Sequence, residues 1–268
     1  MSSDIKSLLD SDQLDEAISV MNGMVRAKPT DIDVRAGLVE LLCYAGNLDR
    51  ADKLLDAIAD IDPGAAVGVA LFRQLVRAEQ ARVQFYEEGR LPEFVAKPDP
   101  VSELELRAAV LLREGDGKGA AALIEERDSL RRPAAGTADK EAFDDFRDLD
   151  DINASHLEVL TSTGKYFWTP ISSVEAIEFR PPQRRRDLIW RRASLSISGG
   201  PDGEIFIPAI YVGKDSATAH RLGHVTDYVG GEDSPVRGLG LRSFLVGDDS
   251  KTIMELTSVT FAPVTVAA

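Results

Sequence analysis

Hydrophobic and polar positions follow two different patterns along the chain. Up to about residue 130, long segments place an apolar residue at every third or fourth position, which is the period of an amphipathic helix. After residue 150, short runs of β-branched and aromatic residues alternate with Gly, Pro, Asp and Asn, which is typical of strands and turns. We therefore expect an N-terminal helical domain followed by a mainly antiparallel β (α+β) domain.

The change of pattern predicts where the domains meet. Pro133-Ala-Ala-Gly136 interrupts the helical period, and an acidic run, Asp144 to Asp151, follows it. We expect a helical domain over 1–132, a linker over 133–150 and the β domain over 151–268.

A repeat runs through the helical half. Leu14-Asp-Glu-Ala17 recurs as Leu48-Asp-Arg-Ala51 at an offset of 34 residues, the period of the tetratricopeptide repeat (TPR). This unit is a helix–turn–helix that buries its apolar face by stacking on its neighbours. A later unit aligns at an offset of 69, with Gly115 in the place of Gly46. The pattern predicts a TPR-like α–α superhelix in which Ala65–Glu88 forms one or two long helices.

Such a superhelix binds its partners in a concave groove. The first helix of each unit lines that groove, which receives an extended peptide or an amphipathic helix. The repeat register turns Glu40 and Tyr44 inward from the second unit, and Gln74 and Arg77 from a third. Tyr and Arg are among the residue types that most often anchor interfaces. These four residues are our expected partner-binding groove, although each is equally compatible with an ordinary surface position.

The second half contains short alternating segments. In Ala193–Ser198, for example, Leu195 and Ile197 share one face and the serines share the other. A compact antiparallel sheet or small barrel is expected, with one short helix after Asp215. The predicted strands are Leu157–Thr161, Lys165–Thr169, Val174–Phe179, Ala193–Ser198, Glu204–Pro208, Arg242–Val246 and Lys251–Leu256.

Composition narrows the classes of function. The chain has 45 acidic and 31 basic residues, a net charge of -14, and residues 1–150 account for -12 of it. Bulk binding to nucleic acid or to anionic membranes is disfavoured, because both need clustered positive charge. The single cysteine, Cys43, cannot form an internal disulfide. With neither an export signal nor a run of about 20 apolar residues, the sequence predicts a cytoplasmic protein that does not enter membranes.

Candidate catalytic and metal sites are weak. Gly115–Gly119 lacks the six-residue spacing and the hydroxyl residue of a phosphate-binding loop, and is predicted to be a repeat turn. His220 and His224 stand four residues apart, but Arg221 occupies the place of a metalloprotease base. We expect no catalytic residue, metal or cofactor. A metal-dependent or other hydrolase built on the β domain stays the alternative.

The densest positive feature is a run of arginines between Arg180 and Arg192, which also contains Trp190. Arginine beside an aromatic residue can bind RNA or single-stranded DNA through stacking and phosphate contacts. The same run can instead neutralise the acidic helical half across an internal interface, or meet acidic surfaces of a partner. Because the chain is strongly acidic, we favour a structural role near the domain junction over nucleic-acid binding.

An ordered set of motifs in the second half carries a resemblance to a known family. These motifs are Phe146–Asp151 with Leu157–Leu160, Gly164–Pro170, Arg186-Asp187-Leu-Ile-Trp190, Ile207–Tyr211, Arg221–Gly223 with Thr226-Asp227, and Arg237–Arg242. In this order they resemble the ImpE/TagJ accessory proteins of bacterial type VI secretion systems. Together with the helical repeats, the likeness covers nearly the whole chain. His224 departs from the pattern, because the family is expected to prefer arginine there.

The resemblance implies a non-enzymatic cytoplasmic adaptor. Members of the family look like binders of the N-terminal helix of TssB, the small subunit of the contractile sheath. The resemblance thereby links them to sheath contraction, or to sheath recycling by the ClpV ATPase. It implies structural or interface roles for the motif positions Arg186, Asp187, Trp190, Arg221, Arg237 and Arg242. Neither the residue pattern nor the resemblance specifies the oligomeric state or the surface that holds the partner.

Overall fold

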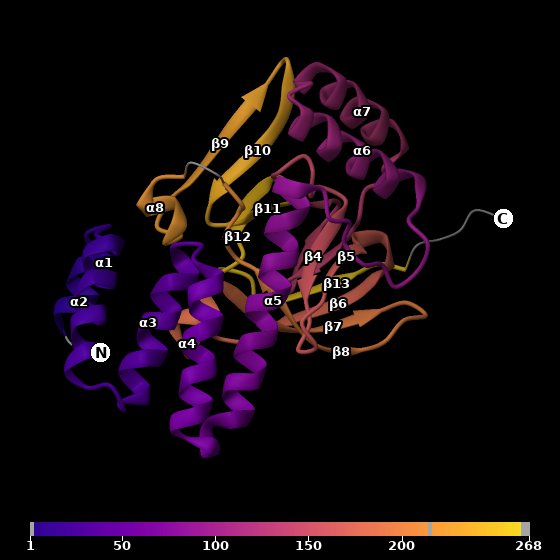
Figure 1. Cartoon of the computed structure of the whole chain (residues 1–268). Coiled ribbons are helices and arrows are strands. Elements are labelled where there is room, and N and C mark those ends of the chain that lie inside the picture. Colours follow the sequence, from indigo (N-terminus) through magenta and orange to yellow (C-terminus); the bar gives the residue numbers. More distant parts are fainter. Residues whose placement is uncertain (1–2, 214–215, 264–268) are drawn as a thin grey trace.

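The computed structural model describes residues 3–213 and 216–263. The helices of the first half follow one another with short connections (Figure 1). They are α1 (Ser3–Asp10), α2 (Leu14–Ala27), α3 (Ile32–Tyr44), α4 (Leu48–Ile61), the 3₁₀ turn η1 (Pro63–Ala65), α5 (Ala66–Glu88), α6 (Pro100–Glu114) and α7 (Gly117–Leu130).

The second repeat unit forms as the sequence predicts. The Asp31 carboxylate caps α3 by accepting a hydrogen bond from the Val34 N–H at 3.1 Å. Gly46 turns the chain with a φ of 72°, a left-handed conformation that glycine adopts without steric cost. Asn47 then caps α4 through the Arg50 N–H. The TPR-like helix–turn–helix is therefore confirmed for α3 and α4.

The later helices depart from a regular superhelix. Ala66–Glu88 is one helix of 23 residues, and Gly89, with a φ of 82°, ends it. Gly115–Gly119 is the turn between α6 and α7, as predicted: Gly115 is left-handed and Asp116 caps α7. This second hairpin lies beside the sheet domain and contacts β10, rather than continuing the row of α1–α5 (Figure 1).

The C-terminal domain is built from antiparallel sheets. The largest sheet has the order β2-β1-β13-β6-β7-β8-β4-β5, and two smaller sheets have the orders β10-β9 and β12-β11-β3. Two 3₁₀ turns, η2 (Ile171–Ser173) and η3 (Arg185–Leu188), and the short helix α8 (Thr218–Arg221) connect strands. The strands are β1 (Gly136–Ala138), β2 (Glu141–Phe143), β3 (Phe146–Asp148), β4 (His156–Leu160), β5 (Tyr166–Pro170), β6 (Val174–Phe179), β7 (Trp190–Ile197), β8 (Gly203–Pro208), β9 (Thr226–Gly231), β10 (Ser234–Gly240), β11 (Ser243–Val246), β12 (Asp249–Thr252) and β13 (Ser258–Phe261).

Most of the predicted strands are present, but the list was incomplete. The hairpin around Gly164 is the β4–β5 pair, and β6 has the predicted bounds. Helix α8 follows Asp215 as expected. The predicted strand Lys251–Leu256 begins earlier, as β12 at Asp249. Strands β9, β10 and β13 had no counterpart in our sequence prediction, and residues 264–268 of the predicted domain lie outside the described residues.

The linker expected over 133–150 is wrong, because this segment forms β1, β2 and β3. Asp145, in the acidic run, holds the segment in place by accepting hydrogen bonds from Arg131 and from the Ala134 N–H. Phe146 is buried and stacks on Phe244 with ring centroids 4.9 Å apart. The acidic run therefore belongs to the sheet domain instead of spanning solvent.

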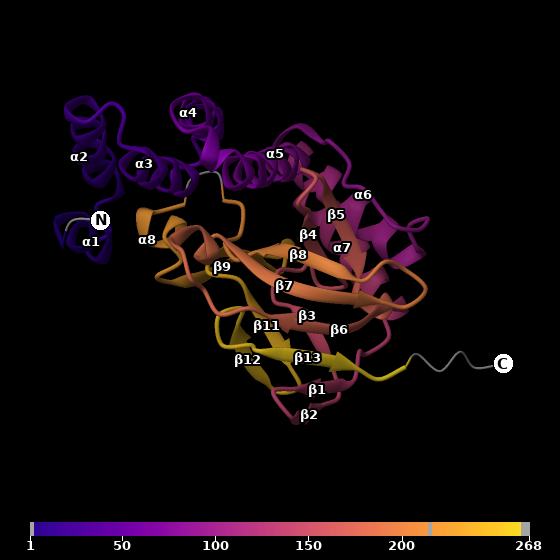
Figure 2. The same cartoon turned by 90° about the horizontal axis from the view of Figure 1, so that it is seen from below.

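Two apolar cores lie on either side of the large sheet. One fills the space between the helices and the sheet and includes Phe85, Trp168 and Trp190. The other lies within the sheet domain and includes Ile177 and Phe244. Seen from below, α1, α3 and α5 form the row nearer the sheet domain, with α2 and α4 outside it (Figure 2). The inner row of the repeats therefore faces the chain's own C-terminal domain.

Candidate functional site

The concave side of the repeats is covered by the chain's own arginine segment, residues 180–192. The Tyr44 hydroxyl on α3 donates a hydrogen bond to the Arg185 carbonyl at 3.1 Å. The Trp190 indole N–H donates to Glu79 on α5 at 3.0 Å, and Trp190 meets Phe72 edge to face. The helical layer thus packs against a segment that is distant in sequence: Arg185 follows Tyr44 by 141 residues.

This contact changes the interpretation of the expected groove. Tyr44 is only 7% exposed, and Glu40 is half-buried beside Arg185 and Arg186. Gln74 lies against the β4–β5 turn, where a Cβ at Gly164 would come within 2.3 Å of its Oε1 atom. These residues do not form one open groove, because the apolar concave face of the repeats is buried against the sheet domain.

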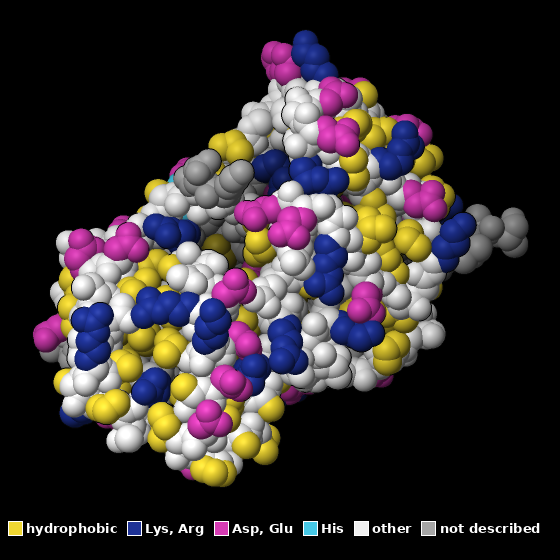
Figure 3. All heavy atoms as spheres, in the orientation of Figure 1, with side chains coloured by type: hydrophobic (Ala, Val, Ile, Leu, Met, Phe, Trp, Pro, Cys, Tyr) yellow, Lys and Arg dark blue, Asp and Glu magenta, His cyan; other side chains and the backbone are white. Residues whose placement is uncertain are grey.

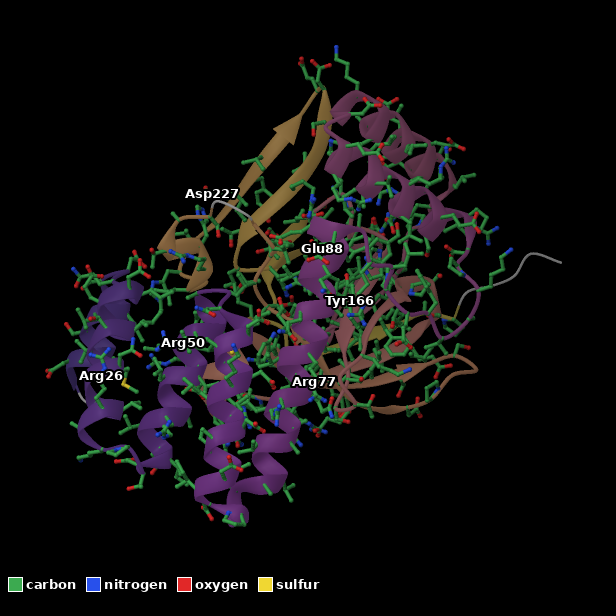
Figure 4. All side chains as sticks on the ribbon, in the orientation of Figure 1. Arg26, Arg50, Arg77, Glu88, Tyr166 and Asp227 are labelled. Atoms are coloured by element: carbon green, nitrogen blue, oxygen red, sulfur yellow. The ribbon has the colours of Figure 1, made fainter. Side chains whose placement is uncertain are left out.

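Arg77, the fourth expected groove residue, lies elsewhere. It is exposed on α5 (Figure 4) and lines a cleft of about 630 Å³ with Gln80, near the α3–α4 turn. The face of the helical layer that looks out from the sheet domain mixes basic, acidic and apolar side chains without a continuous basic surface (Figure 3). Arg77 therefore belongs to an outer polar cleft and not to the concave side.

An opening lies at the concave side, and we call it the arginine cleft. It has a volume of about 210 Å³ and lies between α1, α3 and the turns that surround η3 and α8. Leu188 at its mouth is 40% exposed. The cleft is lined by Leu9, Asp10, Tyr44, Arg185, Leu188, Leu222, Gly223, His224, Leu241 and Met254.

Among the described residues, the ion pairs of the arginine segment are confined to its two ends, although Glu40 and Asp187 act on its charge from nearby. Arg180 pairs with Glu178 and Arg192 with Glu204, but at exposed positions at the two ends. The arginines between these two form no ion pair with a carboxylate of the described residues. They are Arg184, Arg185, Arg186 and Arg191. Nη1 of Arg185 and Nε of Arg191 are buried without a hydrogen-bond partner in that part of the chain.

The pKa values of this segment reflect burial. Burial lowers the pKa of Arg186 and the charge of Arg184 lowers it further, whereas Asp187 and Glu40 act against this. Burial also lowers the pKa of Arg191, which is only 4% exposed. Burial raises the pKa of Glu40, although Arg186 and Arg185 act against this. Arg186 is held by the face of Phe72, 4.8 Å from its guanidinium carbon.

Two other motif arginines, Arg237 and Arg242, form ion pairs inside the protein, although Nε of Arg242 is buried without a hydrogen-bond partner among the described residues. Arg242 is fully buried, donates to Asp148 at 2.8 Å and pairs with Glu158 on β4. Arg82 on α5 reaches the same Glu158 with two hydrogen bonds of 2.9–3.0 Å. Arg237 donates to Asp150 at 2.7 Å. These contacts join α5 to the sheet through one buried ionic network.

The carboxylates of this network differ in their pKa values. Burial alone would raise the pKa of Glu158, but Arg82 and Arg242 hold it well below its usual range. Burial raises the pKa of Asp148 to about 6, against the opposing effect of Arg242. Glu158 is therefore the anion on which both arginines depend.

The sequence reasoning missed these buried acids. Glu158 lies between Leu157 and Val159 in a strand that is buried on both faces, so no alternation marked it as special. A second buried cluster joins Glu105 on α6 to Arg127 and to His156, which stacks on Trp168 with ring centroids 3.5 Å apart. The signal that could have found them is a charged residue within an otherwise apolar run.

The remaining motif residues and the histidine pair have local partners. Asp187 accepts hydrogen bonds from the backbone N–H groups of Gln183 and Arg184, and Arg221 donates to Thr218. His220 contacts Asp227 and His224 contacts Asp12, each at 2.8 Å, so different carboxylates hold the two histidines.

Residues 3–213 and 216–263 contain no group of three or more His, Cys, Asp or Glu side chains arranged to hold a metal ion. Across the same ranges, every helix is too short or too polar to cross a bilayer.

Comparison with known proteins agrees with both halves of the structure. The tetratricopeptide repeat model matches residues 8–75, and the ImpE protein model matches residues 140–260. The chain is 27% identical to the type VI secretion system accessory component TagJ of Pseudomonas aeruginosa, over 96% of this chain and 91% of that protein. The crystal structure of protein VPA1032 from Vibrio parahaemolyticus superposes with a TM-score of 0.91 at 27% identity, covering 97% of this chain and 98% of that one.

The match extends across the domain junction. Both the sequence relative and the solved structure cover the TPR-like helices together with the sheet domain. The motifs on which the resemblance was based lie within the matched range 140–260, including the paired Arg237 and Arg242. The C-terminal part of the chain therefore matches the ImpE protein model, and the chain as a whole is similar to TagJ.

Proposed function

We propose that this protein is a non-catalytic accessory adaptor of a type VI secretion system. The observation that carries the proposal is its continuous similarity to TagJ, which includes both domains and leaves only a small part of either chain unmatched. A shared fold alone would not support a shared role. Similarity along the whole chain does, because it includes the surfaces as well as the scaffold.

The partner in this proposal is the N-terminal helix of a TssB-like small sheath subunit. The TPR-like layer supports it, because such repeats present rigid surfaces to peptides and amphipathic helices. A helix held by a few apolar anchors binds at micromolar strength, about -8 kcal/mol. Such binding is strong enough to recruit the adaptor and weak enough to release it.

The proposal also includes an indirect link to the ClpV ATPase in the cytoplasm. An adaptor that holds the small sheath subunit lies close to any machine that remodels the sheath. We expect ClpV to be recovered with this chain only when the small sheath subunit is present. Recovery of ClpV by the chain alone would replace the indirect link by a direct one.

Calorimetric titration tests the central step. The full chain is titrated with a peptide of the first 30 or so residues of the small sheath subunit from the same organism. We expect a micromolar dissociation constant for this peptide and no heat with a scrambled peptide of the same composition. Absence of binding at several hundred micromolar peptide would refute the proposed partner.

A further inference from the structure

The arginine cleft combines apolar walls with one cation, Arg185, that forms no ion pair with a carboxylate of the described residues. Leu9, Leu188 and Leu222 line it, together with Leu241 and the flexible side chain of Met254. Arg185 enters the same cleft with a buried Nη1 atom that finds no acceptor among the described residues. A buried donor without a partner costs about 1–3 kcal/mol, and more when it is charged. A ligand that fits the cleft therefore supplies one anionic group for Arg185 and one apolar group for the walls.

The size of the cleft limits what can enter. One turn of helix with its side chains is about 10 Å wide and 5.4 Å long, so it fills roughly 400 Å³. The cleft, at about 210 Å³, holds about half of this volume. A helix can therefore lie across the mouth and insert one or two apolar side chains, but it cannot sink into the cleft.

The charges around the mouth select the partner's sequence. Arg185 lies on one side, and Asp10 lines the cleft from α1. His224, also on the rim, is engaged with Asp12. A carboxylate is therefore accepted only beside Arg185, and Asp10 repels it elsewhere. The buried Arg191, next to Met254, adds positive potential from behind.

We propose that the arginine cleft is a docking site for an acidic amphipathic helix of a partner protein. The helix inserts a leucine-sized side chain beside Leu188 and places a Glu or Asp, one helical turn away, on Arg185. Residues three or four apart lie on one helix face, so both groups reach the cleft together. This inference rests on the proposed function, because it specifies which surface receives the sheath helix and what that helix must carry.

Two variants remove the two halves of this chemistry. Arg185→Met keeps an unbranched, flexible side chain and removes its charge, while the backbone carbonyl that receives the Tyr44 hydrogen bond stays in place. Leu188→Asp places a negative, polar group at the exposed mouth. The matched controls are Arg180→Met, an exposed arginine of the same segment, and Leu130→Asp, an exposed leucine elsewhere.

Two peptides serve as probes in calorimetric titrations of the full chain. One is the sheath-subunit peptide, and the other is a designed 20-residue helix with Leu and Glu on one face, matched by a helix with Lys for Glu. We expect Arg185→Met to weaken binding at least tenfold and Leu188→Asp to weaken it at least thirtyfold. Both controls should stay within twofold of the wild type.

The outcomes separate the two proposals. If the sheath peptide binds equally well to wild type, Arg185→Met and Leu188→Asp, the cleft is wrong and the adaptor function stands. If the sheath peptide does not bind but the designed acidic helix binds and depends on both residues, the cleft stands and the sheath partner is wrong. If the designed acidic helix fails as well, or the lysine helix binds equally, the cleft is wrong. Binding of an acidic helix to a chain of net charge -14 cannot come from bulk attraction.

A spectroscopic signal inside the cleft gives an independent readout. The Met254 methyl group lies in the lining and can be observed by NMR in methyl-labelled protein. We expect its resonance, assigned with Met254→Leu, to shift on addition of a bound peptide, while Met21 in the helical core stays unchanged. Peptide binding without a shift at Met254 would contradict docking at this site.

Discussion

The helical layer contacts arginines of the sheet domain at two junctions, and their charges are balanced differently. At the α5–β4 junction, Arg242 and the helix's own Arg82 share the carboxylate of Glu158. At the junction of α3 with the arginine segment, Arg185 and Arg191 form no ion pair with a carboxylate of the described residues. Both junctions bring guanidinium groups out of water, and Arg185, Arg191 and Arg242 each have one buried nitrogen atom without a hydrogen-bond partner among those residues. The junctions differ in direct pairing: the first holds its arginines on carboxylates, whereas Glu40 at the second lies near Arg185 without forming an ion pair with it.

We propose that this difference separates a structural contact from a binding surface. The chain has 45 acidic residues, so a shortage of carboxylates does not explain the unpaired arginines. A network of buried ion pairs fixes the position of two domains. An unpaired one beside an opening keeps interaction energy that a partner can use, because its carboxylate satisfies donors that are already in place. The predictions below test this contrast.

The largest effect is expected from Glu158→Gln. This change leaves Arg82 and Arg242 buried without their shared anion, and breaking such a pair costs about 3–5 kcal/mol. Chemical denaturation should show the loss in the free energy of unfolding. Glu204→Gln, which breaks the exposed pair with Arg192, should cost less than about 1 kcal/mol. Equal losses in the two variants would contradict the structural role of the network.

The paired junction should also respond to pH through Asp148. Its folded-state pKa is raised from 3.8 to about 6, so its contribution to stability is complete below the unfolded pKa and is lost as pH rises through 6. From pH 7 to pH 5, the wild type should gain about 1 kcal/mol relative to Asp148→Asn. Denaturation curves of both proteins at the two pH values measure this difference. A gain in the variant as large as that in the wild type would assign the effect to other groups.

A smaller effect is expected where the repeats meet the arginine segment. Tyr44→Phe removes the hydroxyl that donates to the Arg185 carbonyl but keeps the ring, so it should lower the free energy of unfolding by about 1 kcal/mol. Val67→Ala, at an 85% exposed position of α5, is the control and should have no measurable effect. Unchanged stability of Tyr44→Phe would mean that the closed concave side is not populated in solution.

The smallest effect on folding is expected from Arg185→Met. Removing an unpaired, partly buried cation should leave the free energy of unfolding within about 0.5 kcal/mol of the wild type, or raise it. The same change is the one expected to weaken partner binding. A loss of stability comparable to that of Glu158→Gln would mean that Arg185 stabilises the fold as Glu158 does. The two junctions would then not differ in role.

The sequence predicted the elements whose period is regular. The turn at Gly46 and the strand Val174–Phe179 follow directly from apolar spacing and turn residues. Residues 133–150 were misassigned because their strands have only three residues each, too short for any period to show. These short strands are held in place by hydrogen bonds to Asp145 and by tertiary packing.

The site was harder to predict than the fold. The repeat register correctly turned Tyr44 toward the concave side, but it could not show what covers that side. The covering segment comes from another domain, and its arginines looked alike in sequence. Only their surroundings distinguish the exposed Arg192, which pairs with Glu204, from Arg191, which is buried without a carboxylate.

The long helix α5 has a consequence for how the molecule unfolds. Its Arg82 is 2% exposed and depends on a carboxylate of the sheet, and its Phe85 packs edge to face on Trp168 of β5. A fragment truncated at residue 132 would keep the pair of Arg82 with Glu79 but lose Glu158, and it would present the Phe85 ring to water. The two halves are therefore expected to melt in a single cooperative transition, and cleavage between them should yield insoluble pieces instead of two autonomous modules.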